Sequence, residues 1–203
     1  MNYTVTELEQ LGIRVGANSS IHKSVLFFNP EKIVIGHHVR IDCLSMLSAG
    51  EQGIVIGDHV HIAAGAYLFG SGGKVVFEDF SSISSRVTLY TGTDDFLLGH
   101  MVGPTVPEKY RRVTTGDVIL KKHAAVGSGS IVMCCTLGVG ASIAALSFVK
   151  RNVPDFDIMS GSPAAKIGTR RRMVLDLEKR LREEEAYSLL PEEEQDPFRS
   201  IDK

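Results

Sequence analysis

Bulky apolar residues recur at every sixth position through the middle of the chain. Three tandem units of 21 residues run from Ile33 through Asp95, and each unit holds three such positions. A period of six is neither the 3.6 of a helix nor the 2 of a strand, and it is typical of a repeat architecture. Stacking the units aligns Ile35, Ile56 and Phe77 at the third position, Ile41, Ile62 and Ile83 at the ninth, and Leu47, Leu68 and Leu89 at the fifteenth.

Each six-residue segment is interpreted as one short strand followed by a corner. Three segments then form one turn of a triangular prism, with the recurring aliphatic side chains stacked inside it. Small residues such as Gly36 and Gly57 stand where the chain bends. The three further residues of a unit, centred on Gly50–Gly53 and Gly70–Gly73, are expected to form a corner loop. The pattern predicts an all-β fold, a parallel β-helix.

The regular turns are flanked by less regular segments. Thr6 and Glu9 have capping-box spacing and predict a short N-terminal helix that closes one end of the prism. Residues 93–117 carry no hexad and form a long excursion, which in a compact domain is usually functional. The period resumes over 118–135. One residue is then missing, and a last turn places Leu137, Ile143 and Val149 inside. An atypical first turn is expected around Val15, Ile21 and Phe27.

The end of the chain lacks the repeat. The chain is expected to leave the prism after Pro154 and to turn at Gly161–Ala164. Residues 170–187 have the charge and apolar pattern of an amphipathic helix, and the acidic stretch 191–203 is expected to be a loosely attached tail. The predicted organisation is a β-helix domain over 1–168 and a C-terminal helix and tail over 169–203.

Composition narrows the class of protein. With 203 residues and 43% hydrophobic content, the chain can bury one sizeable core. A formal charge of −2 argues against non-specific nucleic-acid binding. No apolar stretch is long enough to insert into a membrane, and no signal-peptide pattern begins the chain. Cys43, Cys134 and Cys135 lack metal-ligand spacing and are expected to be reduced, small packing residues, so a cytoplasmic location is predicted.

These features together resemble the left-handed β-helix, hexapeptide-repeat acyltransferases over about residues 30–168. The resemblance rests on the hexads, the exit Leu89–Thr93 (LYTGT), and the endings SFVKRNVP and GSPAAKIG. It is strongest toward the galactoside O-acetyltransferases and the nucleotide-sugar N-acetyltransferases of surface polysaccharide (O-antigen, lipopolysaccharide) synthesis. The loop sequence MVGPTVPEKY resembles the second group.

The resemblance implies a homotrimer with acyl-CoA in the groove between subunits and no metal. The implied reaction moves an acetyl group from acetyl-CoA to an amino or hydroxyl group of a sugar, with a nucleotide-linked deoxyamino sugar as the first candidate. One alternative is O-acetylation of free or polymer-linked sugars. Alternatives of other classes are a γ-type carbonic anhydrase, which shares the fold but needs three zinc histidines, and a non-catalytic trimeric scaffold.

The galactoside enzymes carry their basic histidine in a Thr-x-Thr-His-Pro run, where this chain has Thr91–Asp95 with Asp94 in the place of the histidine. Three hypotheses follow. Asp94 or Asp95 acts as base or holds the acceptor's amino group, with one pKa of the pair raised. His100 swings in from the same loop. Or no side chain takes the proton, which goes to solvent or to the departing thiolate. A structural alternative is that both aspartates only cap a turn.

His38, His59 and His123 share one repeat position with Phe80. At a prism corner, where left-handed backbone conformations are common, they are expected to form a stacked column rather than a metal cluster. His123 remains a catalytic candidate because it is the first histidine after the loop.

For the cofactor, the resemblance points to two segments. Gly127 and Ser128 offer a close-approach backbone and a hydroxyl near the thioester, although a corner also requires small residues there; the same assignment includes Ala145 one turn later. The phosphates are assigned to Lys150 and Arg151. In the altered ending Pro163 is retained, Ala165 takes the basic position, and Lys166 and then Arg170 are the expected substitutes. Gly65 stands where relatives use an asparagine to hold the acceptor.

Overall fold

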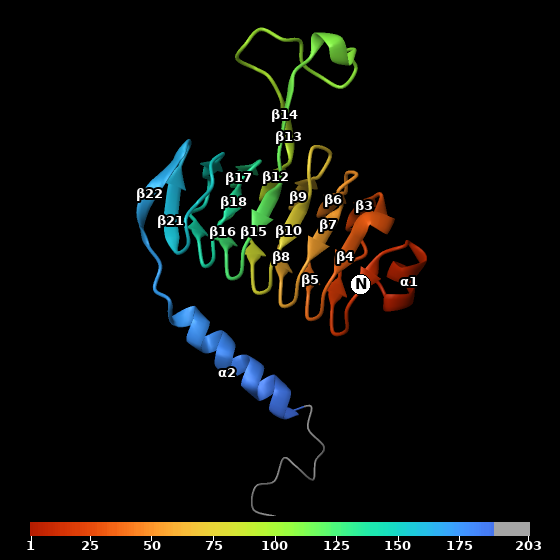
Figure 1. Cartoon of the computed structure of the whole chain (residues 1–203). Coiled ribbons are helices and arrows are strands. Elements are labelled where there is room, and N and C mark those ends of the chain that lie inside the picture. Colours follow the sequence, from red (N-terminus) through yellow and green to blue (C-terminus); the bar gives the residue numbers. More distant parts are fainter. Residues whose placement is uncertain (189–203) are drawn as a thin grey trace, which may run out of the picture. The chain divides into compact units, whose positions relative to one another are not determined.

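A computed structural model describes residues 1–188; the predicted tail over 191–203 lies outside the described residues. Two compact units divide the chain, Met1–Arg170 and Arg171–Lys203. The first unit is a three-sided prism of parallel strands, visible as successive coils in Figure 1.

Each face of the prism is one sheet, in which the strands pair in parallel with the strand one turn away; β22, at the edge of the second sheet, instead pairs antiparallel with β21. The first sheet contains β1 (Arg14–Val15), β4 (Ile33–Ile35), β7 (Ile54–Ile56), β10 (Val75–Phe77), β15 (Val118–Leu120) and β18 (Thr136–Leu137). The second contains β2 (Ser20–Ile21), β5 (Arg40–Ile41), β8 (His61–Ile62), β11 (Ser82–Ile83), β16 (Ala125–Val126), β19 (Ser142–Ile143), β21 (Asp157–Gly161) and β22 (Ala164–Thr169). The third contains β3 (Leu26–Phe28), β6 (Met46–Ser48), β9 (Tyr67–Phe69), β12 (Thr88–Tyr90), β17 (Ile131–Met133) and β20 (Phe148–Val149).

The register confirms the predicted inward columns. Ile56 lies between Ile35 and Phe77, and these three side chains are at most 2% exposed. Leu120 follows Phe77, and Leu137 follows Leu120, so the missing residue before Leu137 is accommodated as predicted. Burial of each such side chain contributes about 1.5–3 kcal/mol of transfer free energy. The predicted first turn is also present, because β1, β2 and β3 pair in register with β4, β5 and β6.

The corner column is confirmed. His38, His59, Phe80 and His123 all have positive φ, from 55° to 60°. Their rings stack with centroids 4.7 to 5.1 Å apart. A Cβ on Gly36 would lie 2.7 Å from the Gly57 carbonyl carbon, which explains why glycine stands where successive corners touch.

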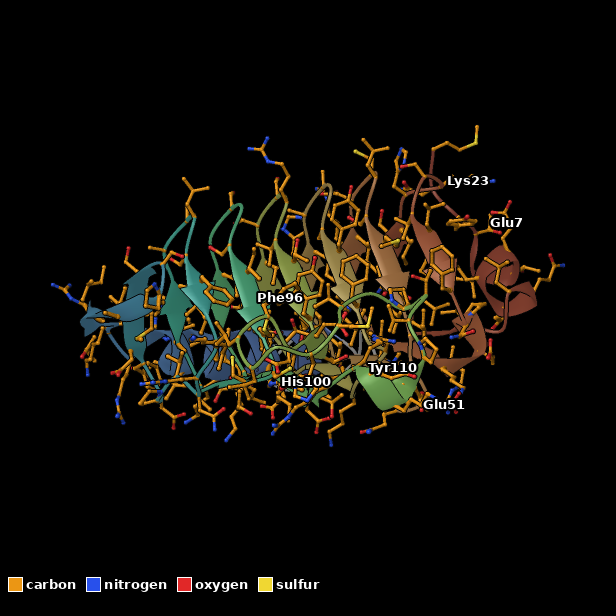
Figure 2. All side chains as sticks on the ribbon, turned by 90° about the horizontal axis from the view of Figure 1, so that it is seen from above. Glu7, Lys23, Glu51, Phe96, His100 and Tyr110 are labelled. Carbon is orange, nitrogen blue, oxygen red and sulfur yellow. The ribbon has the colours of Figure 1, made fainter. Side chains whose placement is uncertain are left out.

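The N-terminal helix is α1 (Val5–Gln10), and its predicted capping box is wrong by two residues. The N-cap is Thr4, whose hydroxyl accepts the Glu7 N–H at 3.2 Å, while the Glu7 carboxylate accepts the Thr4 N–H at 2.7 Å. This earlier start places Leu8 inward, where it is 1% exposed and closes the prism. Glu7 also pairs with Lys23 at 2.6 Å (Figure 2). A short 3₁₀ turn, η1 (Pro30–Lys32), precedes β4.

The excursion projects away from the prism (Figure 1) and is less irregular than the sequence suggested. Its stem is an antiparallel pair, β13 (Gly92–Asp94) and β14 (Val113–Thr115). A 3₁₀ turn, η2 (Glu108–Tyr110), precedes the returning strand. The two strands pair their backbone N–H and C=O groups with each other. The sequence of these 25 residues has no periodicity from which this pairing could be predicted.

The prediction that the chain leaves the prism after Pro154 is wrong. Val153 bridges to Leu137, and β21 extends the second sheet by pairing with β19. β21 then turns back through the predicted turn at Gly161–Ala164 and pairs with β22. These strands follow no hexad, so the repeat could not predict them. In the second unit, α2 (Met173–Ser188) forms where an amphipathic helix was predicted over 170–187. Within residues 1–188, no helix is long and apolar enough to span a membrane.

Candidate active site

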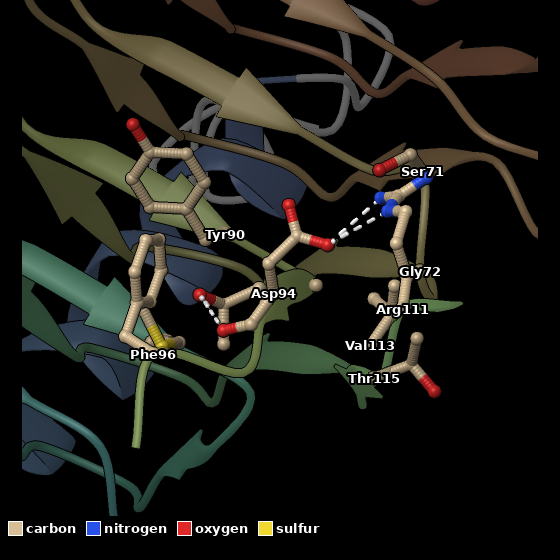
Figure 3. Close-up of a pocket in the computed structure, with 11 residues that line it drawn as sticks. Ser71, Gly72, Tyr90, Asp94, Phe96, Arg111, Val113 and Thr115 are labelled. Atoms are coloured by element: carbon tan, nitrogen blue, oxygen red, sulfur yellow. Dashed lines mark hydrogen bonds and ion pairs between the residues drawn. The ribbon is translucent and has the colours of Figure 1, made fainter. Parts of the chain in front are cut away.

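The base of the excursion encloses a cavity of about 490 Å³ around Asp94 (Figure 3), here called the Asp94 cavity. Its walls come from the third prism face, a corner loop and both strands of the stem. They comprise Ser71, Gly72, Tyr90, Gly92, Thr93, Asp94, Phe96, Arg111, Val113, Thr115 and Met133. Tyr90 stacks on Phe69 at a centroid distance of 4.9 Å, so one wall is a fixed aromatic surface.

The Asp94 carboxylate accepts three hydrogen bonds from two residues. Its Oδ1 accepts from Arg111 Nε at 3.1 Å and from Arg111 Nη2 at 2.8 Å. Its Oδ2 accepts the Gly103 N–H at 3.0 Å. Both the Asp94 and Arg111 side chains are mostly buried, with 17% and 16% exposed.

Asp95, the next residue, has separate partners. Its Oδ1 accepts the N–H groups of Leu97 and Leu98, both at 2.9 Å, and its Oδ2 lies 2.7 Å from His100 Nδ1. Its carboxylate therefore caps a tight turn and orients an imidazole. His100 lies on the excursion loop with Phe96 and Tyr110 (Figure 2), and its side chain is 39% exposed.

The prediction that one pKa of this aspartate pair is raised is wrong. Hydrogen bonds from Arg111, and then from the Gly103 amide, hold the pKa of Asp94 below its ordinary value. Hydrogen bonds from the amides of Leu97 and Leu98 lower the pKa of Asp95. The two carboxylates do not share a proton, because each has its own donors. Both are ionised at neutral pH.

A second cavity adjoins the first, and a third adjoins the second. An apolar cavity of about 510 Å³ shares Thr93, Asp94, Phe96 and Met133 with the Asp94 cavity; its other lining residues are Asp95, Leu97, Thr114, Cys134, Phe148 and Lys150. A basic cavity of about 410 Å³ shares Phe148 and Lys150 with the apolar one; its other lining residues are Val149, Arg151, Asn152, Met159, Pro163 and Ala164. A chain of cavities thus leads from Lys150 and Arg151 to Asp94, suited to a ligand with an anionic end and an apolar arm.

The structure separates the other predicted cofactor residues. Lys150, Arg151 and Pro163 meet in the basic cavity. Lys166 instead pairs with Asp157 at 2.6 Å, and Arg170 Nη1 donates to the His123 carbonyl at 2.8 Å. The charge of Lys166 is therefore engaged within the second sheet, and that of Arg170 with a corner carbonyl.

The remaining candidates lie at other corners. His123 is buried, 5% exposed, and stacks on Phe80 between β15 and β16. Gly127 and Ser128 follow β16, and a Cβ on Gly127 would meet the backbone of Ala145. The small size of Gly127 is thus required by corner stacking. None of these four lines the three cavities described in residues 1–188.

The three cysteines are free. Cys135 is buried, and burial raises the pKa of its thiol to about 11. Cys134 lines the apolar cavity, and burial raises its pKa as well. Neither thiol is activated as a nucleophile, in keeping with the predicted packing role.

Several residues that line the Asp94 cavity or bind Asp94 were missed by the sequence reasoning. Arg111 and Gly103 reach Asp94 from 17 and 9 residues away along the excursion. Tyr90 and Phe96 stand beside Asp94 in the cavity wall. The only sequence signal was the Arg111-Arg112 pair inside a loop already suspected of function.

A parallel prism with an excursion loop, an ionised carboxylate at its base and a line of cavities that ends in a basic one is the arrangement expected of a hexapeptide-repeat acyltransferase. No family model matches the chain. It is 39% identical over 174 residues to the dTDP-4-amino-4,6-dideoxy-D-glucose acyltransferase of Escherichia coli, spanning 85% of this chain and 90% of that protein.

Solved structures of acyltransferases are also similar to this chain. AntD, an N-acyltransferase from Bacillus cereus, in complex with dTDP and 3-hydroxybutyryl-CoA, has a TM-score of 0.86 and 38% identity, with 91% of this chain and 98% of that one covered. An AntD variant bound to dTDP-4-amino-4,6-dideoxyglucose and coenzyme A has a TM-score of 0.85 and 38% identity, covering 90% and 97%. The polysialic-acid-specific acetyltransferase NeuO shares the fold, with a TM-score of 0.55 at 18% identity over 83% of this chain and 93% of that one.

The chain belongs to the left-handed β-helix sugar acyltransferases. It is an acyltransferase that uses coenzyme A thioesters, and this assignment decides against the carbonic anhydrase and scaffold alternatives.

Proposed function

We propose that this protein transfers an acyl group, acetyl in the first instance, from acyl-CoA to the amino group of a dTDP-linked 4-amino-4,6-dideoxyhexose. The observation that carries this proposal is the line of adjoining cavities that ends at the Asp94 carboxylate. The Escherichia coli relative and AntD are described with this class of acceptor, which supports the choice of sugar.

The reaction balances without a further reactant. The acceptor's nitrogen attacks the thioester carbonyl, an N–C bond forms, the C–S bond breaks, and the proton lost from nitrogen ends on the coenzyme A thiol. An ionised Asp94 contributes by binding the N–H of the acceptor at the reacting centre. Two AntD structures carry alanine or asparagine in place of one aspartate, in complex with dTDP and coenzyme A. We take Asp94 as the equivalent residue.

The donor fits the other two cavities. Lys150 and Arg151 would bind the coenzyme A phosphates. The lysine would act as a point charge, and the arginine would donate two parallel hydrogen bonds. The pantetheine arm would then follow Phe148 and Met133 toward Asp94. The carbonyl of the thioester would arrive beside the acceptor's nitrogen.

We also propose a homotrimer in the cytoplasm. The excursion exposes large apolar side chains, with Phe96, Leu97 and Leu98 74%, 89% and 67% exposed, and a second copy of the chain would cover them. The free cysteines suit a reducing compartment. Sedimentation should give three times the 22.1 kDa of one chain, and a stable monomer would contradict the assembly.

Thiol release from acetyl-CoA tests the function. The acceptors to compare are dTDP-4-amino-4,6-dideoxyglucose, its 4-epimer, a UDP-linked amino sugar, and dTDP-6-deoxyglucose, which carries a hydroxyl in place of the amine. Rapid release with a 4-amino sugar, and a product heavier by one acetyl group in mass spectrometry, is expected. Release that never exceeds the acceptor-free rate would overturn the proposal. Transfer to the hydroxyl sugar alone would favour the O-acetyltransferase alternative.

A further inference from the structure

The three hydrogen bonds on Asp94 leave one acceptor site of its carboxylate open to a ligand. A carboxylate offers about four acceptor sites, two on each oxygen. Arg111 occupies Oδ1 through both Nε and Nη2, and the Gly103 amide takes one site on Oδ2. One site on Oδ2 remains. Figure 3 shows this oxygen turned away from Arg111, on the side of the cavity where Tyr90 lies.

The same contacts fix the charge. A guanidinium beside a carboxylate favours the ionised form, as does an amide donor. Accordingly the pKa of Asp94 is lowered, with the Arg111 hydrogen bond as the largest cause. Asp94 is therefore poorly suited to hold a proton and well suited to hold a cation or a polar N–H.

We propose that Arg111 is a positioning residue for acyl transfer: it holds the Asp94 carboxylate in one orientation and aims the remaining acceptor site of Oδ2 at the acceptor's amino group. This inference rests on the proposed function. It adds a reason for choosing nitrogen over oxygen, because an ammonium or amine gains more from a charged acceptor than a hydroxyl does.

Other groups near Asp94 do not replace Arg111. The titratable and charged side chains that line the two cavities containing Asp94 are Tyr90, Asp95, Arg111, Cys134 and Lys150. Of these, Lys150 is the other cation, and it lies at the wall shared with the basic cavity. Asp95 has its own donors and a histidine partner.

The first measurement needs no activity. NMR of protein labelled with [γ-¹³C]aspartate follows the titration of Asp94, and Asp94→Asn assigns its signal. Arg111→Gln should raise the pKa of Asp94 by about one pH unit or more. The matched control is Arg112→Gln, which removes the neighbouring exposed arginine and should leave the titration unchanged. An unchanged Asp94 titration in Arg111→Gln would overturn the inference.

The second measurement is the pH dependence of kcat/KM for acetyl transfer to dTDP-4-amino-4,6-dideoxyglucose. Ionised Asp94 is the active form, so a raised pKa should move the acid limb of Arg111→Gln to higher pH. Arg111→Lys keeps the charge but not the two-pronged geometry, and should return the acid limb toward wild type while kcat stays at least threefold lower. The KM for acetyl-CoA should change less than twofold.

A purely structural role would lower the rate equally at all pH values with the acid limb in place, and that result would reject the inference. If Arg111→Gln fails to fold, Arg111→Lys and its kcat loss decide the matter. A wild-type enzyme that transfers no acyl group to any nucleotide amino sugar would contradict the proposed function. The NMR titration would still test the Arg111–Asp94 pair independently.

Discussion

The prism and the excursion loop are stabilised in different ways. In the prism, each inward side chain touches equivalents one turn above and below, as Ile56 does between Ile35 and Phe77. In the excursion, the backbone order rests on a short stem and on single polar contacts such as Gly103 to Asp94. Many equivalent packing contacts therefore stabilise the scaffold, whereas the site depends on individual hydrogen bonds.

Removing one interior side chain should have the largest effect on stability and little on chemistry. Ile56→Ala is expected to lower the free energy of unfolding by about 2–5 kcal/mol through a cavity in the core. The control is Val55→Ala, at the outward neighbour that is 44% exposed, which should cost less than about 1 kcal/mol. Urea denaturation at fixed protein concentration measures both. Equal losses would mean that the inward column is not the stabilising element.

Asp94→Asn should have a large effect on turnover and little effect on stability. Turnover is expected to fall at least about tenfold with fold and assembly intact, because the charge at the reacting centre is lost. Thiol release gives the rate, and sedimentation checks the assembly. Glu51→Gln, which neutralises an exposed corner carboxylate paired with Lys32 (Figure 2), should keep wild-type turnover. Near wild-type rates in Asp94→Asn would remove Asp94 from the mechanism.

Lys150→Gln tests the cofactor end of the cavities. The KM for acetyl-CoA is expected to rise about tenfold with kcat nearly unchanged, because a phosphate would lose one charge-assisted contact. Initial rates over a range of acetyl-CoA concentrations measure this. Lys32→Gln, at the opposite end of the prism, serves as the control. An unchanged KM would place the phosphates elsewhere.

His100→Gln should have the smallest effect. Because Asp95 orients His100 on the loop and its ring does not line the Asp94 cavity, kcat is expected to stay within about threefold of wild type. A loss of a hundredfold or more would instead support His100 as the base.

The fold was predictable because one physical rule repeats. The columns predicted from the six-residue spacing, from Ile35 to Val149, are all buried, including the shortened step before Leu137. The stem of the excursion and the β21–β22 hairpin were not predictable, because neither repeats. The capping box shifted to Thr4 because burial of Leu8, a tertiary contact, fixes where the helix starts.

The site was predictable only in part. Asp94 and Lys150 came from a family resemblance, and both line the adjoining cavities. The prediction that one pKa of the Asp94–Asp95 pair is raised was wrong, because the donors to each carboxylate arrive through loop closure. No spacing rule identifies Arg111 and Gly103 as partners, since their distance along the chain is set by how the loop folds.

The excursion leaves and rejoins the prism at one corner without disturbing the coil. Val75 pairs directly with Val118 and Phe77 with Leu120, so the strand after the excursion takes the same place as it would without the excursion. Lengthening, shortening or exchanging that segment therefore leaves every interior layer in place. Chimaeras that carry a relative's segment between Tyr90 and Gly116 would therefore test directly whether this loop sets acceptor choice.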